Sequence, residues 1–428
     1  MYVGPRSHAI DFYHVNFVPS AVRSGFNVYD AAEHPTIATW IDNAREVDGS
    51  KRLGGCLNLN QRLYPTGFCP TATPFLYSLH SLGLIGPFDL RFWIFHLLAT
   101  ALCMFGLFLM GRTCSLDQPT SWLVCGLIMS FCWGLFLDAQ LANVTRIQIF
   151  GLAVAVAATR SRCKWGIALA GFTLAVGCAY KPTILPSLGF WLFVLAVDRR
   201  WRDLLIGFGG LAIGSAISAI FPLVLFDSLD CWSDWKHFAS AELSALATSF
   251  PGNYSLSSAL MARGHQWAAA LPWIFGAGLI LAFAWTAFPA AQNEDGKDWR
   301  DMRLGLAIVV GPLWAILSSP LTWVQYSALA MPLVIVLLGV TSRRKSPSGL
   351  WLSLLIASAA LSGGMLQRFF AIEDLWLDAG TLWTGWFGLL LASLWLLFSM
   401  HQANRQSVKP VTSQPILATR FSRMGLGK

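Results

Sequence analysis

The chain contains 428 residues, of which 55% are hydrophobic, 12% are charged and 20 are tryptophan, and its formal net charge is +8. A soluble domain carries about 25% charged residues, so this composition excludes an ordinary soluble protein. Tryptophan in this abundance suits the aromatic belts at the two interfaces of a bilayer. Because helices satisfy their own backbone hydrogen bonds in lipid, we expect an all-α polytopic membrane protein.

Eleven apolar segments follow one another along the chain and are candidate membrane spans. The first covers residues 92–110, contains no charged residue and is long enough to cross a hydrocarbon core of about 30 Å. The others cover residues 121–137, 147–158, 165–180, 184–197, 204–226, 267–288, 304–317, 326–341, 349–366 and 381–400. Three of them (147–158, 184–197 and 304–317) are short for a full crossing, which favours re-entrant or broken helices.

The connections between these segments differ in their content of Lys and Arg, which favour the cytoplasmic side of a membrane. If residues 1–91 lie outside, the more basic connections fall in the cytoplasm with Arg112, Arg160, Arg162, Lys164, Arg199, Arg200, Arg202, Lys297, Arg300, Arg303, Arg343, Arg344 and Lys345. Eleven spans then place the basic tail, residues 401–428, in the cytoplasm as well. Topology explains the positive charge, and no nucleic-acid partner is expected.

The sequence thus divides into an outer segment (residues 1–91), a transmembrane bundle (residues 92–400) with an outer loop at 227–266, and the tail. No apolar span or signal sequence precedes the outer segment to carry it across the membrane. We therefore expect a first transmembrane helix upstream of residue 1. In the alternative, residues 70–87 insert and invert the scheme, but the basic connections would then lie outside.

The outer segment opens with a carboxylate, Asp11, on an aromatic-rich stretch. The residues that follow it at helical intervals are Tyr13, His14, Phe17, Val18 and Val22. This spacing predicts an amphipathic helix that lies on the membrane surface with its apolar residues toward lipid. A shorter apolar stretch that ends near residue 87 is also expected at the interface. Asp11 itself fits an N-cap, a common role for aspartate at this position.

Lys181 stands at an outer boundary, in the stretch AYKPTILP, where Pro182 breaks the helix. A lysine there is either a snorkelling anchor or the counter-ion of a phosphate. Arg146 is expected at the same depth on a neighbouring connection. Polar residues gather around it (Asp138, Gln140, Asn143 and Gln148), and polar groups at membrane depth require partners.

Five stretches resemble, in order, elements of glycosyltransferase family 87, whose members are membrane enzymes that take sugars from polyprenyl phosphates. They are DFYHVNFVPSAVRSGFNVYD at 11–30, LYPTGF at 63–68, the segment 147–201 that contains AYKPT, GNYSLSSAL at 252–260 and SSPLTWVQY at 318–326. The chain departs from the family pattern at Thr66, Ile147, Phe150 and Gln325. At the position of Gln325 the family often has His. These departures leave the donor sugar and the acceptor open.

The resemblance implies a GT-C fold, here a bundle of about eleven membrane segments with outer amphipathic loop helices. It implies transfer of a sugar, with mannose favoured, from a polyprenyl-phosphate-linked donor to a hydroxyl of a glycan or glycolipid acceptor, in contact with membrane lipids. A carboxylate near the acceptor hydroxyl can take up its proton. Asp11 is the expected base and Asp30 the second choice, although Asp30 also suits a helix cap.

The expected ligands of the donor phosphate are Lys181, Arg146 and Arg263. The expected contacts with sugar, lipid or acceptor are Tyr29, Tyr64, Gln148, Asn253, Trp323 and Gln325. Aromatic residues at this depth also suit a membrane belt. Because the leaving group is already a phosphate, no general acid is required and one carboxylate can suffice. Attack opposite the phosphate predicts inversion. No Asp-x-Asp pair stands out, so we expect no metal, and no other cofactor is expected.

We expect a multi-pass protein of the inner cell membrane, with the active site on the periplasmic side and the C-terminus in the cytoplasm. A transporter or flippase would also show broken helices and an intramembrane lysine. Against that alternative, the sequence has no convincing internal repeat and its polar residues cluster on one face. A silent membrane scaffold leaves Asp11 and Lys181 unexplained, although Gln325 in place of His fits lost activity.

Overall fold

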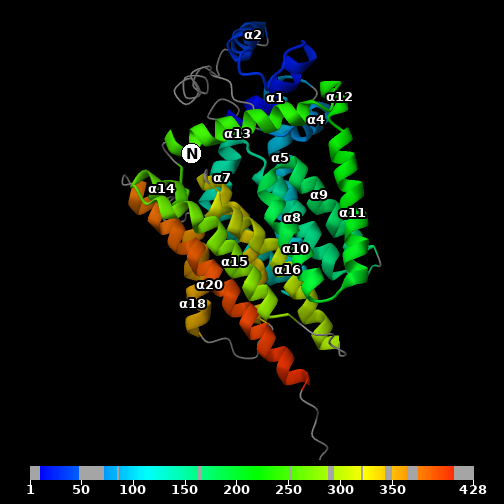
Figure 1. The fold of residues 1–428 in the computed structure, drawn as a ribbon, viewed down its shortest axis with the longest axis vertical. Coiled ribbons are helices and arrows are strands. Elements are labelled where there is room, and N and C mark those ends of the chain that lie inside the picture. Colours follow the sequence, from blue (N-terminus) through cyan, green and yellow to red (C-terminus); the bar gives the residue numbers. More distant parts are fainter. Residues whose placement is uncertain are drawn as a thin grey trace, which may run out of the picture.

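The structure is a computed structural model that describes residues 10–47, 72–83, 86–161, 163, 165–249, 253–287, 294–319, 322–342, 349–363 and 375–408. Within these residues the chain forms helices and no strands, which confirms the all-α class. Long helices form a bundle, and a layer of shorter helices covers one end of it (Figure 1). We call this layer the outer helices.

The outer helices are α1 (Ile10–Arg23), α2 (His34–Val47), α4 (Pro74–Gly83), α12 (Leu223–Phe226) and α13 (Cys231–Ser249). The amphipathic helix predicted after Asp11 is present as α1, but its apolar face does not point to lipid. Phe12 and Val18 of α1 are fully buried inside the protein. The orientation was predicted wrongly because α4 and the start of the first long helix, α5 (Phe88–Thr113), offer α1 an apolar partner surface.

The first half of the bundle runs from α5 to α11. Its elements after α5 are α6 (Gln118–Phe131), α7 (Trp133–Leu141), α8 (Thr145–Arg160), α9 (Gly166–Tyr180), the 3₁₀ helix η2 (Pro182–Ile184), α10 (Leu185–Val197) and α11 (Trp201–Ile220). Residues 121–137, predicted as one span, are broken at Cys132, and the two pieces meet at a bend of 64°. The Gly134 N–H donates to Gly363 O at 3.3 Å, so one backbone group at the break finds a partner in another segment.

The second half of the bundle contains α14 (Leu256–Ala262), the 3₁₀ helix η3 (Gln266–Ala270), α15 (Leu271–Trp285), α16 (Glu294–Ser318), the 3₁₀ helix η4 (Val324–Ala330), α17 (Met331–Ser342), α18 (Gly349–Ser362) and α20 (Leu375–Val408). The segment 304–317 was predicted to be short, and this was wrong, because α16 has 25 residues. Hydropathy misses its first turns, which are polar but continue the same backbone hydrogen bonds.

Each of the eleven predicted segments overlaps a helix of the structure. Six helices in the described residues are long and apolar enough to cross a membrane, or seven if the bent pair α6–α7 counts as one span. Three shorter apolar helices cover Gly166–Tyr180, Pro182–Val197 and Trp351–Ser362. The chain is therefore a polytopic membrane protein.

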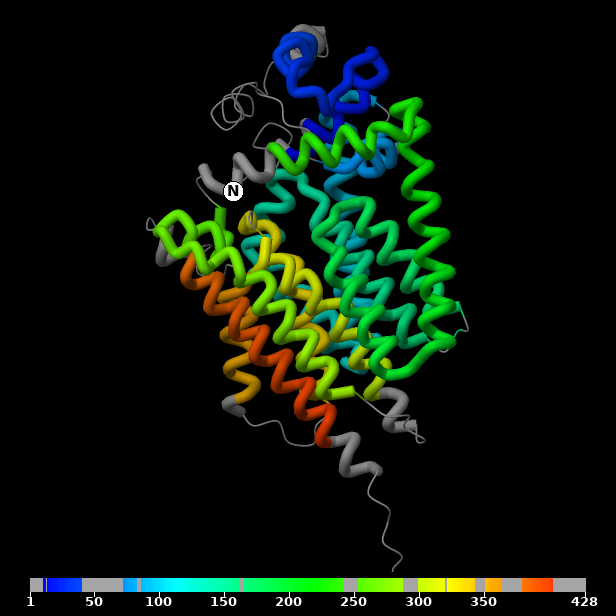
Figure 2. The backbone as a smooth tube through the Cα atoms, in the orientation of Figure 1, coloured from blue at the N-terminus to red at the C-terminus, as the bar shows by residue number. Residues whose placement is uncertain are grey.

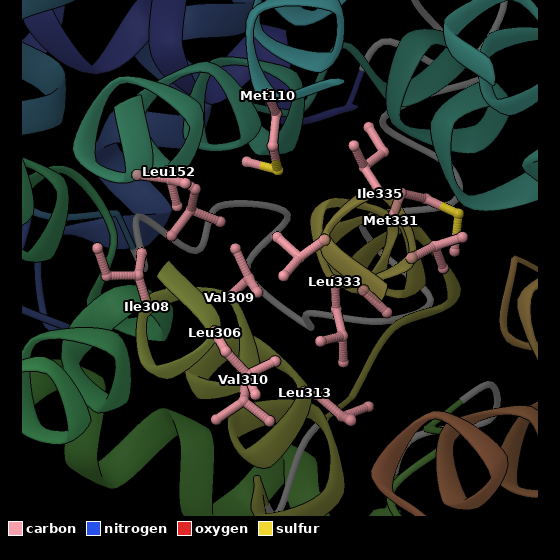
Figure 3. Close-up of a cluster of buried hydrophobic side chains, with 14 of the residues drawn as sticks. Met110, Leu152, Leu306, Ile308, Val309, Val310, Leu313, Met331, Leu333 and Ile335 are labelled. Carbon is pink, nitrogen blue, oxygen red and sulfur yellow. The ribbon is translucent and has the colours of Figure 1, made fainter. Parts of the chain in front are cut away.

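The core of the bundle surrounds α16 and α17, whose apolar windows are each 89% buried. Leu306, Val309 and Leu313 of α16 meet Met331 and Leu333 of α17 in this core (Figure 3). The corresponding windows of α5, α11 and α15 are only 22–33% buried, so these three helices expose apolar side chains at the periphery. Figure 2 follows the chain through both halves of the bundle. The periphery suits contact with lipid, and the centre holds the bundle together.

At the end of the bundle opposite the outer helices, a buried ion pair joins the residue that follows α10 to a residue within α16. Arg303 pairs with Asp198, and both side chains are 0% exposed. The sequence placed Arg303 in a cytoplasmic connection, but it lies inside α16. Its guanidinium also donates to Phe283 O. A buried charge is costly unless it is paired and hydrogen-bonded, and this arrangement meets that requirement.

Candidate active site

Asp11 is held in place by the residue that follows it. The Phe12 ring lies against the rings of Phe88, Phe92 and Phe95 of α5, with centroid distances of 5.3, 5.5 and 5.4 Å. This aromatic cluster fixes the first turn of α1 on α5. The Asp11 carboxylate, on the adjacent position of the same turn, therefore stands at a defined place above the bundle.

Asn143 lies in the sharp junction between α7 and α8. Ala142 adopts a left-handed conformation with φ 52°, and the Asn143 N–H donates to Asp138 O at 2.9 Å. The side-chain Oδ1 of Asn143 accepts from the N–H of Val144 at 2.6 Å. The junction thereby sets the direction of the Asn143 amide, with its NH₂ group free to reach out of the turn.

Lys181 follows the last residue of α9, where Pro182 ends the helix. Its backbone is extended, with φ −155°, and its N–H still donates to Gly177 O at 2.9 Å. The change from helical to extended backbone directs the side chain away from the α9 axis. The sequence predicted this break from the Lys-Pro pair alone.

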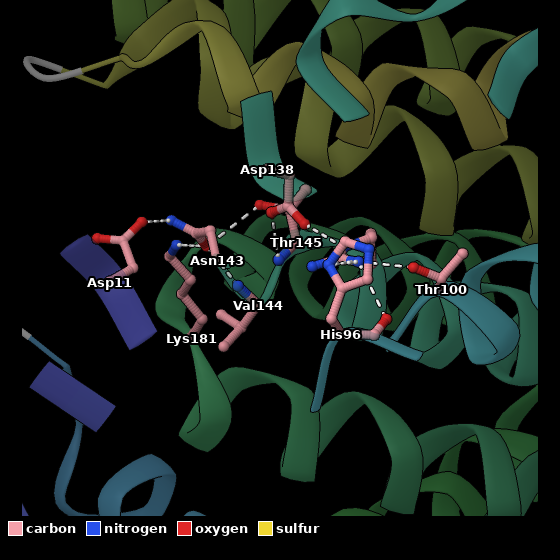
Figure 4. Close-up of polar contacts among 9 residues, drawn as sticks. Asp11, His96, Thr100, Asp138, Asn143, Val144, Thr145 and Lys181 are labelled. Carbon is pink, nitrogen blue, oxygen red and sulfur yellow. Dashed lines mark hydrogen bonds and ion pairs between the residues drawn. The ribbon is translucent and has the colours of Figure 1, made fainter. Parts of the chain in front are cut away.

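These three elements bring Asp11, Asn143 and Lys181 together (Figure 4). Asn143 Nδ2 donates to Asp11 Oδ2 at 2.6 Å, and Lys181 Nζ donates to Asn143 Oδ1 at 3.0 Å. The carboxylate and the ammonium are thus joined through one amide. We call these three residues the Asn143 bridge.

Electrostatics in the Asn143 bridge act in two directions on Asp11. Burial raises the pKa of Asp11 above its ordinary value of 3.8, because a buried carboxylate loses its hydration. The Lys181 ammonium and the hydrogen bond from Asn143 oppose this rise by favouring the charged form. A carboxyl group whose pKa lies closer to neutrality is a stronger proton acceptor than an ordinary surface aspartate.

Tyr326 completes the surroundings of Lys181. The Lys181 Nζ lies 4.5 Å from the centroid of the Tyr326 ring, a cation–π geometry. Tyr326 belongs to η4, which packs closely on α7 at Gly134. A Cβ added at Gly134 would lie 2.9 Å from Ala328 N and 3.0 Å from Val324 O, so only glycine allows this approach.

A second polar group lies directly behind the bridge. Arg146 Nε pairs with Asp138 Oδ2 at 2.7 Å, and the two side chains are 1% and 0% exposed. The other carboxylate oxygen of Asp138 accepts from the Thr145 N–H at 3.0 Å, at the start of α8. Arg146 Nη1 donates to Thr100 Oγ1 at 2.7 Å, which ties α8 to α5. The structure thus supplies partners for the two charged groups of the predicted polar patch, although Arg146 Nη2 is buried without a hydrogen-bond partner among the described residues.

Gln148, two residues after Arg146 in α8, reaches the Lys-Pro-Thr stretch. Its Nε2 donates to Thr183 Oγ1 at 2.8 Å. Its Oε1 is buried and has no hydrogen-bond partner in the part of the chain that the structure describes. An acceptor in this condition is available to a hydroxyl donor.

Other expected site residues are engaged elsewhere. Asp30 is exposed and accepts from the Ala32 N–H at 2.9 Å, as a cap does. The Tyr29 hydroxyl donates to Ala72 O at 3.0 Å, and its ring stacks on Phe226. Arg263 is exposed after α14 and is not part of the Asn143 bridge.

Three further expected residues, Asn253, Trp323 and Gln325, lie in or near η4. Asn253 Oδ1 accepts from the backbone N–H groups of Ser255 and Thr322, both at 2.9 Å, so this side chain joins two connections. Trp323 directly precedes η4, and Gln325 is buried within it, next to Tyr326. Tyr64 lies outside the described residues.

Sequence reasoning missed Tyr326, Thr100 and also His96, whose backbone O accepts from Arg146 Nη1 at 3.3 Å. Tyr326 was part of a quoted motif, but nothing in its spacing indicated that it would lie under Lys181. Thr100 and His96 belong to an apolar helix, where two polar residues four positions apart are the only signal of a buried partner.

An open cavity of about 460 Å³ lies beside α2 and is lined by Phe26, Pro35, Thr36, Thr39 and Trp40. It includes neither Asp11 nor Lys181. Among the described residues, no three His, Cys, Asp or Glu side chains gather as a metal site would require.

Comparison with known proteins identifies the family. No curated protein and no solved structure matches this chain. The model of glycosyltransferase family 87 matches residues 63–320, which is more than half of the chain and includes Asn143 and Lys181. The protein is a membrane protein that belongs to glycosyltransferase family 87.

Proposed function

We propose that this glycosyltransferase moves a sugar from a polyprenyl-phosphate donor to an acceptor hydroxyl, with Asp11 as the general base and Lys181 as the ligand of the departing phosphate. The supporting observation is the Asn143 bridge, which holds a carboxylate and an ammonium at opposite ends of one amide. A transfer from a lipid phosphate needs one group of each charge.

Asp11 has the geometry of a base. Only its Oδ2 receives a hydrogen bond from a described residue, so Oδ1 is available to an acceptor hydroxyl. The hydroxyl must lose its proton as it attacks the anomeric carbon, and a carboxylate within hydrogen-bond reach contributes about 10²–10⁴-fold to such a step. Burial raises the pKa of Asp11, which strengthens it as a proton acceptor.

Lys181 has the geometry of a phosphate ligand. Negative charge develops on the phosphate as the glycosidic bond breaks, and a fixed ammonium in a partly dehydrated site stabilises that charge. The Tyr326 ring and Asn143 Oδ1 hold the ammonium from two sides. Because the leaving group is a phosphate, no general acid is required, and attack from the opposite side inverts the anomeric centre.

Arg146 has a supporting role in this mechanism. Its pairing with the buried Asp138 fixes the junction that carries Asn143. Its role is therefore to position Asn143, whereas the sequence suggested a direct contact with the donor phosphate. Gln148 Oε1 is the side-chain acceptor best suited to a sugar hydroxyl, since it is buried and unpaired among the described residues.

The topology of the proposal follows from charge. The outer helices and the Asn143 bridge lie toward one end, and the basic connections lie toward the other, so we assign the bridge to the periplasmic side of the inner membrane and the C-terminus to the cytoplasm. Within a GT-C fold, the lipid-linked donor then enters from the bilayer. Mannose is the proposed sugar and a glycan or glycolipid the proposed acceptor.

The test uses membranes that contain the full chain and radiolabelled polyprenyl-phosphate mannose. We expect label to pass to a membrane acceptor, and we expect Asp11→Asn to abolish the transfer at unchanged protein level. If label reaches the opposite leaflet while still attached to polyprenyl phosphate, the protein is a flippase and the proposal is wrong.

A further inference from the structure

The inference concerns α4, whose residues are not part of the Asn143 bridge but contact the helix that carries Lys181. The last turn of any helix leaves carbonyl groups without backbone donors. In α9 these carbonyls precede Lys181 directly. Whatever binds them therefore controls where Lys181 leaves the helix.

Thr73, immediately before α4, binds these carbonyls. Its hydroxyl donates to Ala179 O at 2.6 Å and lies 3.3 Å from Tyr180 O. The same Thr73 oxygen accepts from the Leu76 N–H at 3.2 Å and so caps the start of α4. One side chain, 2% exposed, thus joins the beginning of α4 to the end of α9.

His80 makes a second connection, nearly two turns further along α4. Its Nε2 lies 2.9 Å from the Tyr180 hydroxyl, and the two rings stack with their centroids 6.0 Å apart. Burial lowers the pKa of His80 to about 4, so the ring is neutral at physiological pH. The ring of Phe95 in α5 also packs against the His80 ring, with a centroid distance of 5.3 Å.

Two contacts to consecutive residues determine both the position and the rotation of the last turn of α9. A single contact would leave the turn free to rotate about that point. Lys181 comes next in the chain, and its ammonium must reach Asn143 Oδ1 and the Tyr326 ring at the same time. A small rotation of the turn would remove one of these contacts.

We propose that Thr73 and His80 are positioning residues for binding of the donor phosphate. They hold the end of α9 in the position from which the Lys181 ammonium reaches that phosphate. This inference rests on the proposed function of Lys181. It extends that function to a helix outside the bridge. Its consequence is that α4 sets the affinity for lipid phosphate without touching the ligand.

The probe is a radiolabelled polyprenyl monophosphate, which carries the phosphate of the proposed leaving group and needs neither the donor sugar nor the acceptor. Binding to the full chain in lipid nanodiscs is measured by titration. A polyprenol without phosphate is the control ligand. We expect Lys181→Met to weaken binding of the phosphate about tenfold or more and to leave polyprenol binding unchanged.

The α4 variants are Thr73→Val, which removes the hydroxyl at constant size, and His80→Phe, which keeps the ring and removes the hydrogen bond. We expect each to weaken phosphate binding about three- to fivefold, as for the loss of one buried hydrogen bond. Thr73→Ser keeps the hydroxyl and should bind within about twofold of the natural chain. Thr39→Val is the matched control, because the exposed Thr39 hydroxyl donates to Pro35 O in its own helix and, among the described residues, to no other helix.

The deciding measurement combines Thr73→Val with Lys181→Met. If Thr73 acts through Lys181, Thr73→Val should weaken phosphate binding almost no further in a chain that already carries Lys181→Met. An equal loss in both backgrounds, or no loss in either α4 variant, would overturn the inference and leave the proposed function intact. Unchanged phosphate binding in Lys181→Met would instead overturn the proposed function. Helix content and thermal unfolding of each variant identify loss of folding. If Thr73→Val fails to fold, the result for His80→Phe decides the test.

Discussion

Asp11 and Lys181 lie far apart in the chain and bind the opposite ends of the Asn143 side chain. The amide donates to the carboxylate at 2.6 Å and accepts from the ammonium at 3.0 Å (Figure 4). This polarity is the only one that satisfies both charged groups, because a carboxylate only accepts hydrogen bonds and an ammonium only donates them. The bridge thus keeps the carboxylate and the ammonium apart, with one amide between them.

Replacement of Asp11 tests the base. Asp11→Asn keeps the size of the side chain but removes its basicity, and we expect the sugar-transfer rate to fall by about 10²–10⁴-fold. The measurement is the initial rate of label transfer from polyprenyl-phosphate mannose. Asp30→Asn is the matched control, since Asp30 is exposed and caps a turn, and its rate should stay within about twofold. A full rate in Asp11→Asn would assign the base elsewhere.

Replacement of Lys181 tests the phosphate ligand during turnover. Lys181→Met keeps an unbranched side chain, one atom shorter, and removes the charge. We therefore expect kcat/KM for the lipid-linked donor to fall about tenfold or more, at an unchanged KM for acceptor. Lys236→Met, an exposed lysine of α13, serves as the control for loss of one positive charge. Equal kinetics in the two variants would make Lys181 a membrane anchor.

The bridge also predicts a pH dependence. Transfer requires the ionised Asp11, so kcat/KM should rise with pH as this carboxyl loses its proton, with a midpoint above the ordinary pKa of 3.8. The hydrogen bond from Asn143 lowers the pKa, so its removal in Asn143→Leu raises the pKa and moves the midpoint to higher pH. The measurement is kcat/KM against pH for both proteins. A midpoint that stays in place or moves to lower pH contradicts the role of Asn143.

The buried pair behind the bridge makes a prediction about stability. Asp138→Asn leaves the Arg146 charge without its partner in a fully buried place, and we expect a loss of about 3–5 kcal/mol in the free energy of unfolding. Thermal unfolding in detergent is the measurement. The pair Arg200–Asp203, whose side chains are 15% and 31% exposed, provides the comparison. Because Arg200 also pairs with Asp301, Asp203→Asn should lose only about 0–1 kcal/mol. Similar losses in both variants would show that burial of the Arg146 pair has no special weight.

Close packing at Gly134 makes a prediction about Tyr326. Gly134→Ala introduces a methyl group that meets Ser327 Oγ, Ala328 N and Val324 O, so η4 must shift at a cost of about 1–3 kcal/mol. The shift should also weaken binding of polyprenyl phosphate, because Tyr326 leaves the Lys181 ammonium. Gly126→Ala in α6 is the control, since its Cβ meets no atom within 4 Å. Normal phosphate binding in Gly134→Ala would show that the Tyr326 contact is dispensable.

The sequence predicted the helical segments well and their internal details less well. All eleven apolar segments overlap helices, because hydrophobicity over a span is a local property of the chain. The break at Cys132 depends on a bond from Gly134 to the distant Gly363, which no local pattern contains. The orientation of α1 was missed for a similar reason. Its apolar face packs against α4 and α5, whereas the sequence pattern fits contact with lipid equally well.

The site residues were predicted from two kinds of signal. Lys181 stood out because Pro182 ends a helix at a membrane boundary, and the structure has that break. Tyr29, Asp30 and Asn253 were suggested by position in a motif, yet each uses its side chain in a local or packing hydrogen bond. Motif position identifies a segment, but the free atoms of a side chain are known only when its neighbours are placed.

The sequence by itself determined the membrane class, the apolar segments, the polar patch around Arg146 and the helix break before Pro182. These follow from hydrophobicity and backbone stereochemistry within a few residues. The tertiary structure alone decided that Asp11, Asn143, Lys181 and Tyr326 lie together, and that Asp138 forms an ion pair with Arg146. The physical reason is that such meetings depend on how each helix is rotated and packed against partners distant in the chain, and the total packing of the bundle sets that rotation.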